Sequence, residues 1–401
     1  MTSVSSTAEA TAARGGERAK TAPLDYVDAV RVLLIILVIA HHSVEPYVSH
    51  HPAEWVLPDA PIPRAWVFLW VNASFFMGTF FFLGGYFMPG ACARRGPGAF
   101  AGERLLRLGL PLAFGYVLLV PLEAWFRYGA AGLPPEGYWD YFRFDFLGHR
   151  PRPDYWPVDR YWPEKNFGHL WFLEHLLVYA LLYALWRRLA PSPRAAPAGA
   201  AAPPGTLAIL GYALALTLAA VVIRRWYPID RWVGLFGFIQ MEPAHLPQYL
   251  SLLAIGVYAG PRRWIETMPR RRGLAWMAVG AGLVAAAYAA IGIGGGAHFD
   301  PNGFAECAYE SLLCVALTIG LPVAARELRL GAGPLWRTLG ANVLAVYVFH
   351  FPIVMALQWA LIGSGLPLWG RLIATVAAAV PLTFLFTNFV VLQLPGSRRV
   401  F

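Results

Sequence analysis

Apolar segments long enough to cross a lipid bilayer recur along nearly the whole of this 401-residue chain. A membrane-spanning helix needs about 20 mainly apolar residues, and only 14% of this chain is charged, against about 25% in soluble domains. The sequence therefore predicts an all-α fold, a polytopic integral membrane helix bundle of about ten transmembrane helices. The predicted spans are 27–48, 66–89, 105–126, 169–188, 206–225, 244–260, 273–293, 304–324, 336–360 and 367–391.

The basic residues indicate how the chain is oriented. The formal net charge is +9, and nearly all of the positive charge is arginine, since lysine occurs only at Lys20 and Lys165. The arginines gather in short loops on the side that would also hold both termini, which is the positive-inside pattern of cytoplasmic loops. We therefore expect both termini to be cytoplasmic. We also expect the lipid bilayer, and no nucleic acid, to be the partner of these charges.

Polar segments divide the chain. Residues 1–24 are expected to form a disordered cytoplasmic tail, followed by a transmembrane domain over 25–393 and a cytoplasmic C-terminal tail at 394–401. Residues 191–205, rich in Pro, Ala and Gly, are interpreted as a flexible cytoplasmic linker. The long external segment 128–168 is dense in aromatic and acidic residues. Such a segment suits sugar rings, although an aromatic belt at the membrane interface is the favoured interpretation.

The first apolar segment carries ionisable residues near both ends. Asp28 and Arg31 lie three residues apart and can pair on one helix face. His42 follows Arg31 by eleven residues, which places it within about 20° of the same face and roughly 16 Å further along the helix. His41 lies about 80° away from that face, so the two histidines cannot do the same job. Ionisable groups inside a membrane are costly and by default indicate function.

Arg104 and Arg107 begin the third apolar segment at its expected cytoplasmic end and share a helix face. Two guanidinium groups there suit a polyphosphate ligand such as coenzyme A. Lipid phosphates or simple positive-inside anchoring account for them as well, and anchoring is favoured when the pair is taken alone.

Glu174 lies near the start of the fourth apolar segment, where a carboxylate needs a partner or a proton. His169 and His175 on the same segment could supply one, and so could His42 on the first.

His350 lies in the middle of the ninth segment, two residues before Pro352. Proline frees a backbone carbonyl one turn back, here near Val348, and bends the helix. His350 is therefore expected to face the protein interior, either in a direct role or as a hydrogen-bond partner of another helix. The adjacent glycines Gly84 and Gly85 in the second segment are expected to permit close helix packing rather than local unwinding.

Five motifs occur in a fixed order along the chain, and together they resemble membrane-bound acyltransferase family 3. Within that family the chain is most similar to the branch that contains glucans biosynthesis protein C. The resemblance extends from about residue 24 to residue 393. The motifs are Asp28-x-x-Arg31 with His42 eleven residues later, Phe81-Phe82-Leu83-Gly84-Gly85-Tyr86-Phe87, Arg104-x-x-Arg107-x-x-Leu110-Pro111, His169-Leu170-Trp171-Phe172-Leu173 and Tyr347-x-x-His350-x-Pro352.

The resemblance implies transfer of an acetyl or succinyl group from cytoplasmic acyl-CoA, that is acetyl-CoA or succinyl-CoA. The implied acceptor is a hydroxyl of a carbohydrate, a glycan or a lipid-linked molecule. By the family pattern His42 is the essential catalytic residue with Arg31, and Arg104 and Arg107 serve the acyl-CoA. Supporting positions fall on the remaining motif residues His169, Trp171, Tyr347 and His350.

Two departures from the family pattern are visible. The Phe-Phe-x-x-Ser-Gly of many members reads Phe81-Phe82-Leu83-Gly84-Gly85 here, so a serine hydroxyl is absent. The soluble hydrolase-like domain of some members is not found either, so a second transfer step is expected to need another protein.

Several alternatives stay open. His42 can act as a general base on the acceptor hydroxyl, or it can take the acyl group itself and pass it on. Asp28 or Glu174 could orient the charges. A permease for a small anion or metabolite, with intramembrane His, Arg and Glu as a relay, is the alternative function.

No metal is expected, because Cys92, Cys307 and Cys314 lack metal-ligand spacing. The composition is rich in Arg, Ala and Pro and poor in Lys, as in hosts with high-GC coding, so a multi-pass protein of a bacterial plasma membrane is expected.

Overall fold

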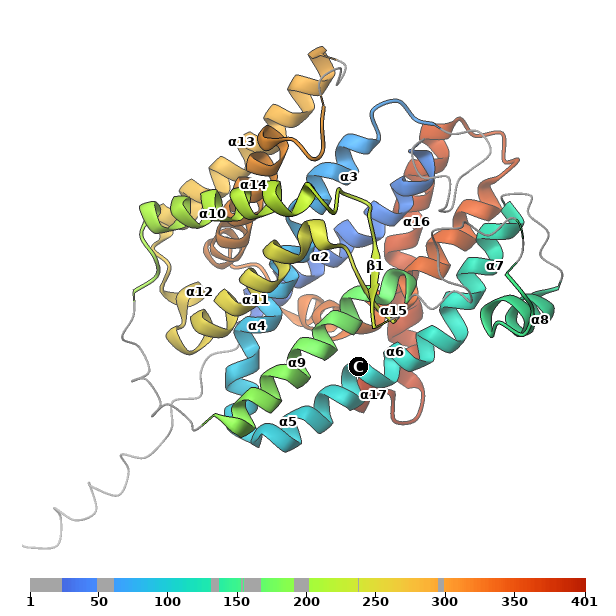
Figure 1. Ribbon diagram of the computed structural model, residues 1–401, viewed down its shortest axis with the longest axis horizontal. Helices are drawn as coiled ribbons and strands as arrows, with labels where there is room; N and C mark the ends of the chain where they lie inside the picture. The colour runs from blue at the N-terminus through green and yellow to red at the C-terminus, as the bar shows by residue number, and fades with distance from the viewer. Residues whose placement is uncertain are drawn as a thin grey trace, which may run out of the picture.

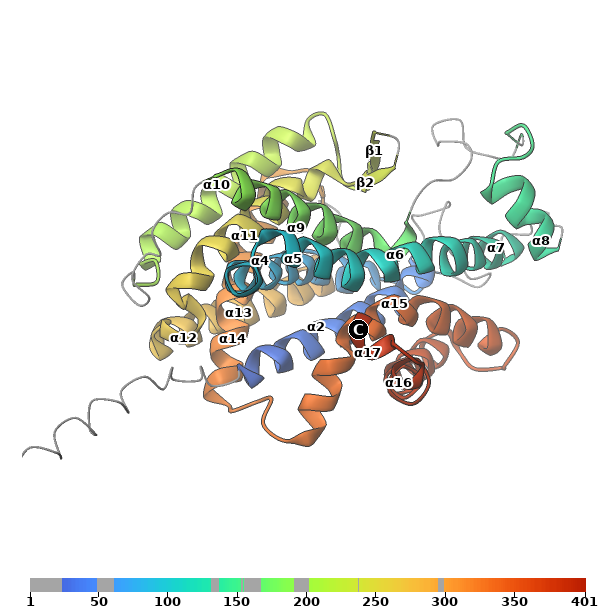
Figure 2. The same ribbon diagram turned by 90° about the horizontal axis from the view of Figure 1, so that it is seen from below.

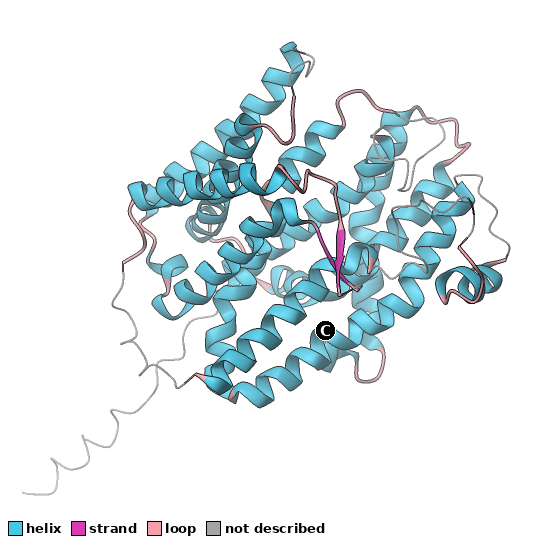
Figure 3. Ribbon diagram, viewed as in Figure 1, coloured by secondary structure: helices cyan, strands magenta, loops and turns pink. Residues whose placement is uncertain are grey.

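The computed structural model describes residues 24–48, 61–130, 137–152, 154, 167–190, 202–236, 238–294 and 299–401. Most of these residues are helical, and the β structure among them is one two-stranded hairpin (Figure 3). The all-α, polytopic bundle predicted from the sequence is confirmed. In the described part of the chain, nine helical segments are long and apolar enough to span a membrane: Asp25–Tyr47, Trp66–Arg95, Pro97–Arg127, Gly168–Leu189, Thr206–Arg224, Arg270–Ala290, Phe304–Glu327, Pro334–Leu361 and Leu368–Gln393.

The elements follow one another in a simple order. The first half contains α2 (Asp25–Val44), η1 (Glu45–Tyr47), α3 (Trp66–Ala73), α4 (Phe76–Arg95), α5 (Pro97–Arg104), η2 (Leu105–Gly109), α6 (Leu110–Phe114), η3 (Gly115–Leu119), α7 (Val120–Ala130), α8 (Tyr138–Asp140), η4 (Tyr141–Phe146), η5 (Gly168–Leu170) and α9 (Trp171–Leu189). The second half contains α10 (Thr206–Arg224), β1 (Val233–Leu235), β2 (Ile239–Met241), η6 (Pro243–His245), α11 (Leu246–Ala259), η7 (Gly260–Arg262), α12 (Trp264–Thr267), α13 (Arg270–Gly294), α14 (Phe304–Glu327), α15 (Pro334–Leu361), α16 (Leu368–Phe389), η8 (Val391–Gln393) and α17 (Ser397–Val400).

α2 lies in the interior of the bundle (Figures 1 and 2). It packs against α15 and also contacts α3, α4, α14 and α16. Its middle is apolar on every side, from Val32 to Ile39, as expected of a helix surrounded by other helices. Pro46 follows closely, and the chain leaves the α-helix at Val44. The interior position of α2 brings the histidines of its last turn into the bundle.

α4 and α11 approach each other at backbone distance. A Cβ added to Gly256 would lie 2.2 Å from the carbonyl oxygen of Phe82, and one added to Gly260 would lie 2.1 Å from that of Tyr86. The same test places a Cβ on Gly85 2.2 Å from a carbonyl oxygen of α11. The close packing predicted for the glycine pair of the second span is therefore confirmed. Phe82 lies opposite Gly256, and four residues further along each helix Tyr86 lies opposite Gly260. The residue numbers therefore rise in the same direction along both helices, so α4 and α11 run parallel.

Replacing Gly256 with alanine is expected to lower the free energy of unfolding by about 1–3 kcal/mol, because the helices must separate to admit the methyl group. Thermal unfolding of the detergent-purified protein measures this as a lower Tm. Gly211 on α10 has open space around it, so Gly211→Ala is the matched control and should leave Tm unchanged or raise it. Equal Tm values for the two variants would contradict the packing at α4 and α11.

The predicted span 244–260 is helical but is not one of the nine apolar segments. It lies within η6, α11 and η7, which together cover Pro243–Arg262, and it carries the polar residues Gln248 and Ser251. Both are satisfied inside the bundle: Gln248 donates to a backbone carbonyl before α4 (2.7 Å), and Ser251 bonds the Tyr212 hydroxyl (2.7 Å). The tenth predicted span is therefore a helix packed along α4, with its two polar side chains bonded inside the bundle.

The third span contains two π-helical turns, η2 and η3, that the sequence analysis did not predict. Each precedes a proline by two residues, Pro111 and Pro121. A proline ring clashes with the carbonyl four residues earlier, and that carbonyl lies inside a π turn in both cases. Such turns often occur at functional sites, and the first of them contains Arg107.

Several predicted segments lie largely outside the described residues. This holds for the tail 1–24 up to residue 23, for 191–201 of the predicted linker, and for 131–136, 153 and 155–166 of the external segment. In the described part of the external segment, the ring of Phe146 packs on that of Tyr116 at a centre-to-centre distance of 5.2 Å, whereas Trp139 is 75% exposed. The predicted tail 394–401 folds back onto the third span, where α17 contacts η2 (Figure 1).

Candidate active site

The last turn of α2 brings two histidines onto one carboxylate. Oε2 of Glu45 lies 2.7 Å from Nδ1 of His42, and Oε1 lies 3.4 Å from Nε2 of His41. An ionised carboxylate only accepts hydrogen bonds, so each imidazole presents an N–H to it. For His42 this places the proton on Nδ1 and leaves Nε2 as the basic nitrogen.

Asn72 distinguishes the two histidines. Its amide nitrogen donates to the backbone oxygen of Leu37 (3.2 Å) and to Nδ1 of His41 (3.3 Å). The contact with Leu37 sets the amide orientation, because a reversed amide would place two oxygens against each other. Both nitrogens of His41 are then engaged, by Asn72 and Glu45. Within the described residues, His42 is therefore the one of the two histidines with a ring nitrogen that makes no hydrogen bond.

Two further histidines continue from His42 into the bundle. The ring centre of His350 lies 5.2 Å from that of His42, and the ring centre of His169 lies 5.2 Å from that of His350. His350 is fully buried, and its Nδ1 donates to the backbone oxygen of Tyr347 (2.7 Å). Its Nε2 has no hydrogen-bond partner within the described ranges. The expected interior position of His350 is confirmed.

His169 is held on both sides. Its Nε2 donates to the backbone oxygen of Val348 (3.0 Å), and its Nδ1 lies 3.1 Å from the carboxylate of Glu123. Val348 lies four residues before Pro352, so its carbonyl is the one that proline frees. The predicted free carbonyl is confirmed, and His169 is its partner. The Tyr347 hydroxyl in turn donates to the backbone oxygen of His169.

The opposite end of α2 carries the predicted basic group. Arg31 bonds Asp28 at 3.0 Å, as the spacing predicts, and its guanidinium lies 4.7 Å from the ring centre of Phe87. Arg31, Arg104 and Arg107 lie close enough to one another to interact electrostatically. These three arginines therefore gather at one end of the bundle.

Arg104 and Arg107 differ in their partners. Arg107 donates to backbone oxygens of Val400 (3.4 Å) and Phe401 (2.6 Å), which holds α17 against the third span. Arg104 lies over the ring of Phe100 at 5.0 Å. Its Nε has no hydrogen-bond partner in the part of the chain that the structure describes. Arg104 is therefore the more available of the two for an anionic ligand.

Glu174 and Trp171 belong to a different neighbourhood from His42. Glu174 accepts a hydrogen bond from the backbone amide of Gln240 (3.3 Å), and His175 bonds the carbonyl of the same residue (2.7 Å). The partner of Glu174 is thus β2 of the hairpin rather than a histidine. Trp171 stacks on Tyr249 at 5.6 Å. Figure 2 shows the hairpin standing over α9, where these residues lie.

A second group of buried charges joins the hairpin to α3, α10 and α14. Arg224 pairs with Glu310, which also accepts from the Trp70 indole (3.0 Å), and His245 bonds Glu242 (2.6 Å). Burial alone would raise the pKa of the Glu242 carboxyl, but the adjacent His245 imidazole outweighs it and holds that pKa below its usual range. Over the described residues, none of these groups bonds His42 or Glu45, and we assign the group to structure.

Sequence reasoning missed three residues of the site. Glu45 lies three and four residues after the two histidines, a spacing at which side chains meet on a helix, so it could have been found. Asn72 and Glu123 come from other helices, and no local pattern indicates their contacts. The described ranges hold no group of three or more His, Cys, Asp or Glu side chains arranged to bind a metal ion.

Comparison with known proteins decides the family. A family model described as an acyltransferase domain matches residues 24–388. The chain belongs to acyltransferase family 3. Searches of curated proteins and of solved structures found no match. As a member of acyltransferase family 3, the chain is a membrane O-acyltransferase, which moves acyl groups other than aminoacyl groups.

Proposed function

We propose that this acyltransferase moves an acetyl or succinyl group from cytoplasmic acyl-CoA to a hydroxyl of a carbohydrate, glycan or lipid-linked acceptor. The observation that carries the proposal is the Glu45–His42 hydrogen bond, which leaves Nε2 of His42 free as a base. The His42 side chain is 17% exposed, so a substrate can reach it, whereas His350 is fully buried. The composition supports a bacterial plasma membrane, and the motif resemblance supports the glucans biosynthesis protein C branch.

The reaction needs one proton carrier. Nε2 of His42 takes the proton of the acceptor hydroxyl while the oxygen attacks the thioester carbon. The C–O bond forms, the C–S bond breaks, and its electron pair leaves on sulfur. The His42 imidazolium then returns the proton to the thiolate, which gives the ester and free coenzyme A. Glu45 stabilises the imidazolium and holds its orientation, a role usually worth a large share of general-base catalysis.

The donor would enter from the arginine end of α2. Phosphate groups suit the guanidinium groups of Arg31, Arg104 and Arg107, and Asp28 orients Arg31. α2 is one unbroken helix from there to His42, about 16 Å further along the same face. Ile35 and Val38 lie between Arg31 and His42 on this face and are buried, so the thioester arm of the donor would reach the imidazole along this face only after the helices packed on it part. His350, His169 and Tyr347 support the far side of the site.

Arg104→Gln is expected to raise KM for acetyl-CoA about tenfold or more while kcat stays within about threefold, because the charge binds the donor but lies far from the reacting atoms. Steady-state rates of the detergent-purified protein measure both constants. Arg188→Gln, an exposed arginine at the end of α9, is the matched control and should change neither. A fall in kcat without a change in KM would contradict donor binding at Arg104.

Radiolabelled acetyl-CoA tests the proposed function itself. Saturable binding to the purified protein and transfer of the label to a hydroxyl acceptor in membrane extract are the expected results. Absence of binding, together with uptake of a small anion by proteoliposomes that contain the protein, would overturn the proposal in favour of a permease.

A further inference from the structure

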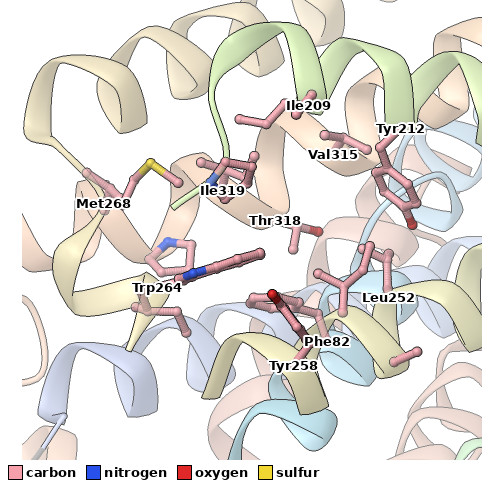
Figure 4. A pocket seen from close by; sticks show the side chains of 17 residues that line it. Phe82, Ile209, Tyr212, Leu252, Tyr258, Trp264, Met268, Val315, Thr318 and Ile319 are labelled. Carbon is pink, nitrogen blue, oxygen red and sulfur yellow. The ribbon is translucent and has the colours of Figure 1, made fainter. Parts of the chain in front are cut away.

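An apolar cavity of about 430 Å³ lies apart from the site around His42 (Figure 4). Its lining residues come from α10, α11, α12 and α14, together with Phe82 of α4 and the connecting residues Pro204 and Met268. Representative lining residues are Ile209, Leu252, Trp264 and Ile319. No residue of the His42 site lines it, and its surface is almost entirely hydrocarbon. Such a surface disfavours a hydrophilic substrate and favours an aliphatic chain.

The cavity is a cleft whose open side lies between α10 and α11. The hydrogen bond between Tyr212 and Ser251 (2.7 Å) joins α10 to α11 at one end. Ala208 on α10 and Ala254 on α11 line the cavity and are exposed. Neighbouring apolar side chains of α10 are exposed too, Leu207 at 86%. In a membrane protein such a surface faces lipid, so the cleft opens toward the bilayer.

Arginines surround the other end of the cleft. Arg272 donates to the backbone oxygen of the lining residue Pro204 (3.0 Å). The guanidinium of Arg262 lies 3.5 Å from the ring centre of Tyr258, which also lines the cavity. Within the described ranges, no acidic side chain forms an ion pair with Arg262 or Arg272. The apolar cleft therefore ends at two cationic groups that form no ion pair with any described residue.

We propose that the cleft binds one acyl chain of an anionic phospholipid, with the lipid phosphate at Arg262 and Arg272. The apolar walls match the chain, and the two guanidinium groups match the negative headgroup. The arginine-rich segment 261–272, which contains α12, belongs to the side predicted to be cytoplasmic by its charge, so the lipid comes from the cytoplasmic leaflet. The inference does not depend on the acyl-transfer mechanism, because the cleft and the His42 site share no residue.

Native mass spectrometry of the delipidated full-length protein tests the proposal. The probe is an equimolar mixture of palmitoyl-oleoyl phosphatidylglycerol and palmitoyl-oleoyl phosphatidylcholine in detergent. The wild type is expected to bind one phosphatidylglycerol in preference to phosphatidylcholine. In the double variant Arg262→Gln/Arg272→Gln, the ratio of bound phosphatidylglycerol to bound phosphatidylcholine should fall about fivefold for each arginine replaced. The matched double variant Arg187→Gln/Arg188→Gln, at the end of α9, should retain it.

A second variant tests the cleft rather than the charges. Ala208→Phe fills the cavity from an exposed helix position, so the fold is expected to tolerate it, and Tm checks this. The Ala208→Phe variant should no longer bind the single phosphatidylglycerol molecule that the wild type binds. Free inorganic phosphate at millimolar concentration should not displace the lipid. Equal binding of both lipids by the wild type, an undiminished preference in the Arg262/Arg272 variant, or displacement by phosphate alone would each overturn the proposal.

Discussion

Replacing His42 with alanine is expected to lower acyl transfer from acetyl-CoA by about 10²–10⁴-fold, the usual contribution of a general base. No neighbouring group can take over, because both nitrogens of His41 are engaged and His350 is fully buried. The measurement is the rate of label transfer from radiolabelled acetyl-CoA by detergent-purified protein. Binding of acetyl-CoA should be retained, since the arginines at the far end of α2 are untouched.

His41→Ala is the matched control, one position away on the same helix. The substitution removes a hydrogen-bond partner of Glu45 and Asn72 but leaves the basic nitrogen of His42 in place. The rate of acyl transfer is therefore expected to fall by no more than about tenfold. Both variants should show the wild-type Tm within a few degrees. Retained activity in His42→Ala, or a larger loss in His41→Ala, would contradict the assignment of the basic nitrogen to His42.

Glu45→Ala is expected to lower kcat by about 10²-fold or more. Without the carboxylate, the proton of the His42 imidazole is no longer held on Nδ1, and the imidazolium formed during transfer loses its counter-charge. Replacing the comparable carboxylate with an amide in a serine protease costs about 10⁴ in kcat. KM for acetyl-CoA should change little, because Glu45 lies at the opposite end of α2 from Arg31. Steady-state kinetics with varied acetyl-CoA separate the two constants.

Glu45→Gln is the conservative counterpart. Its amide N–H can donate to Nδ1 of His42, which would place the imidazole proton on Nε2, the nitrogen that must act as base, so a loss at least as large as that of Glu45→Ala is expected. If Glu45→Gln and Glu45→Ala were both as active as the wild type, the hydrogen bond at 2.7 Å would have no part in catalysis.

The membrane architecture was predictable because its signals are local. The length and apolarity of each segment decide whether it can cross a bilayer, and helix geometry alone separates the faces of His41 and His42. The free carbonyl at Val348 followed from Pro352 in the same way. Each of these inferences needs only residues that are neighbours along one helix.

The contacts between helices were not predictable from one sequence. Glu174 was expected to pair with a histidine, but it bonds the amide of Gln240 in a hairpin whose three-residue strands leave no periodic signal. Asn72 reaches His41 from α3, and Glu123 reaches His169 from α7. The cytoplasmic location of both termini and the roles of the site residues stay predictions.

A double-mutant cycle on kcat tests the central claim most directly. It compares wild type, His42→Ala, Glu45→Ala and the double variant by label transfer from acetyl-CoA. If Glu45 acts through His42, the double variant will be as slow as His42→Ala and no slower, because the two residues act as one unit. If the two losses multiply instead, Glu45 acts independently of His42, and the pair is not the catalytic unit of this acyltransferase.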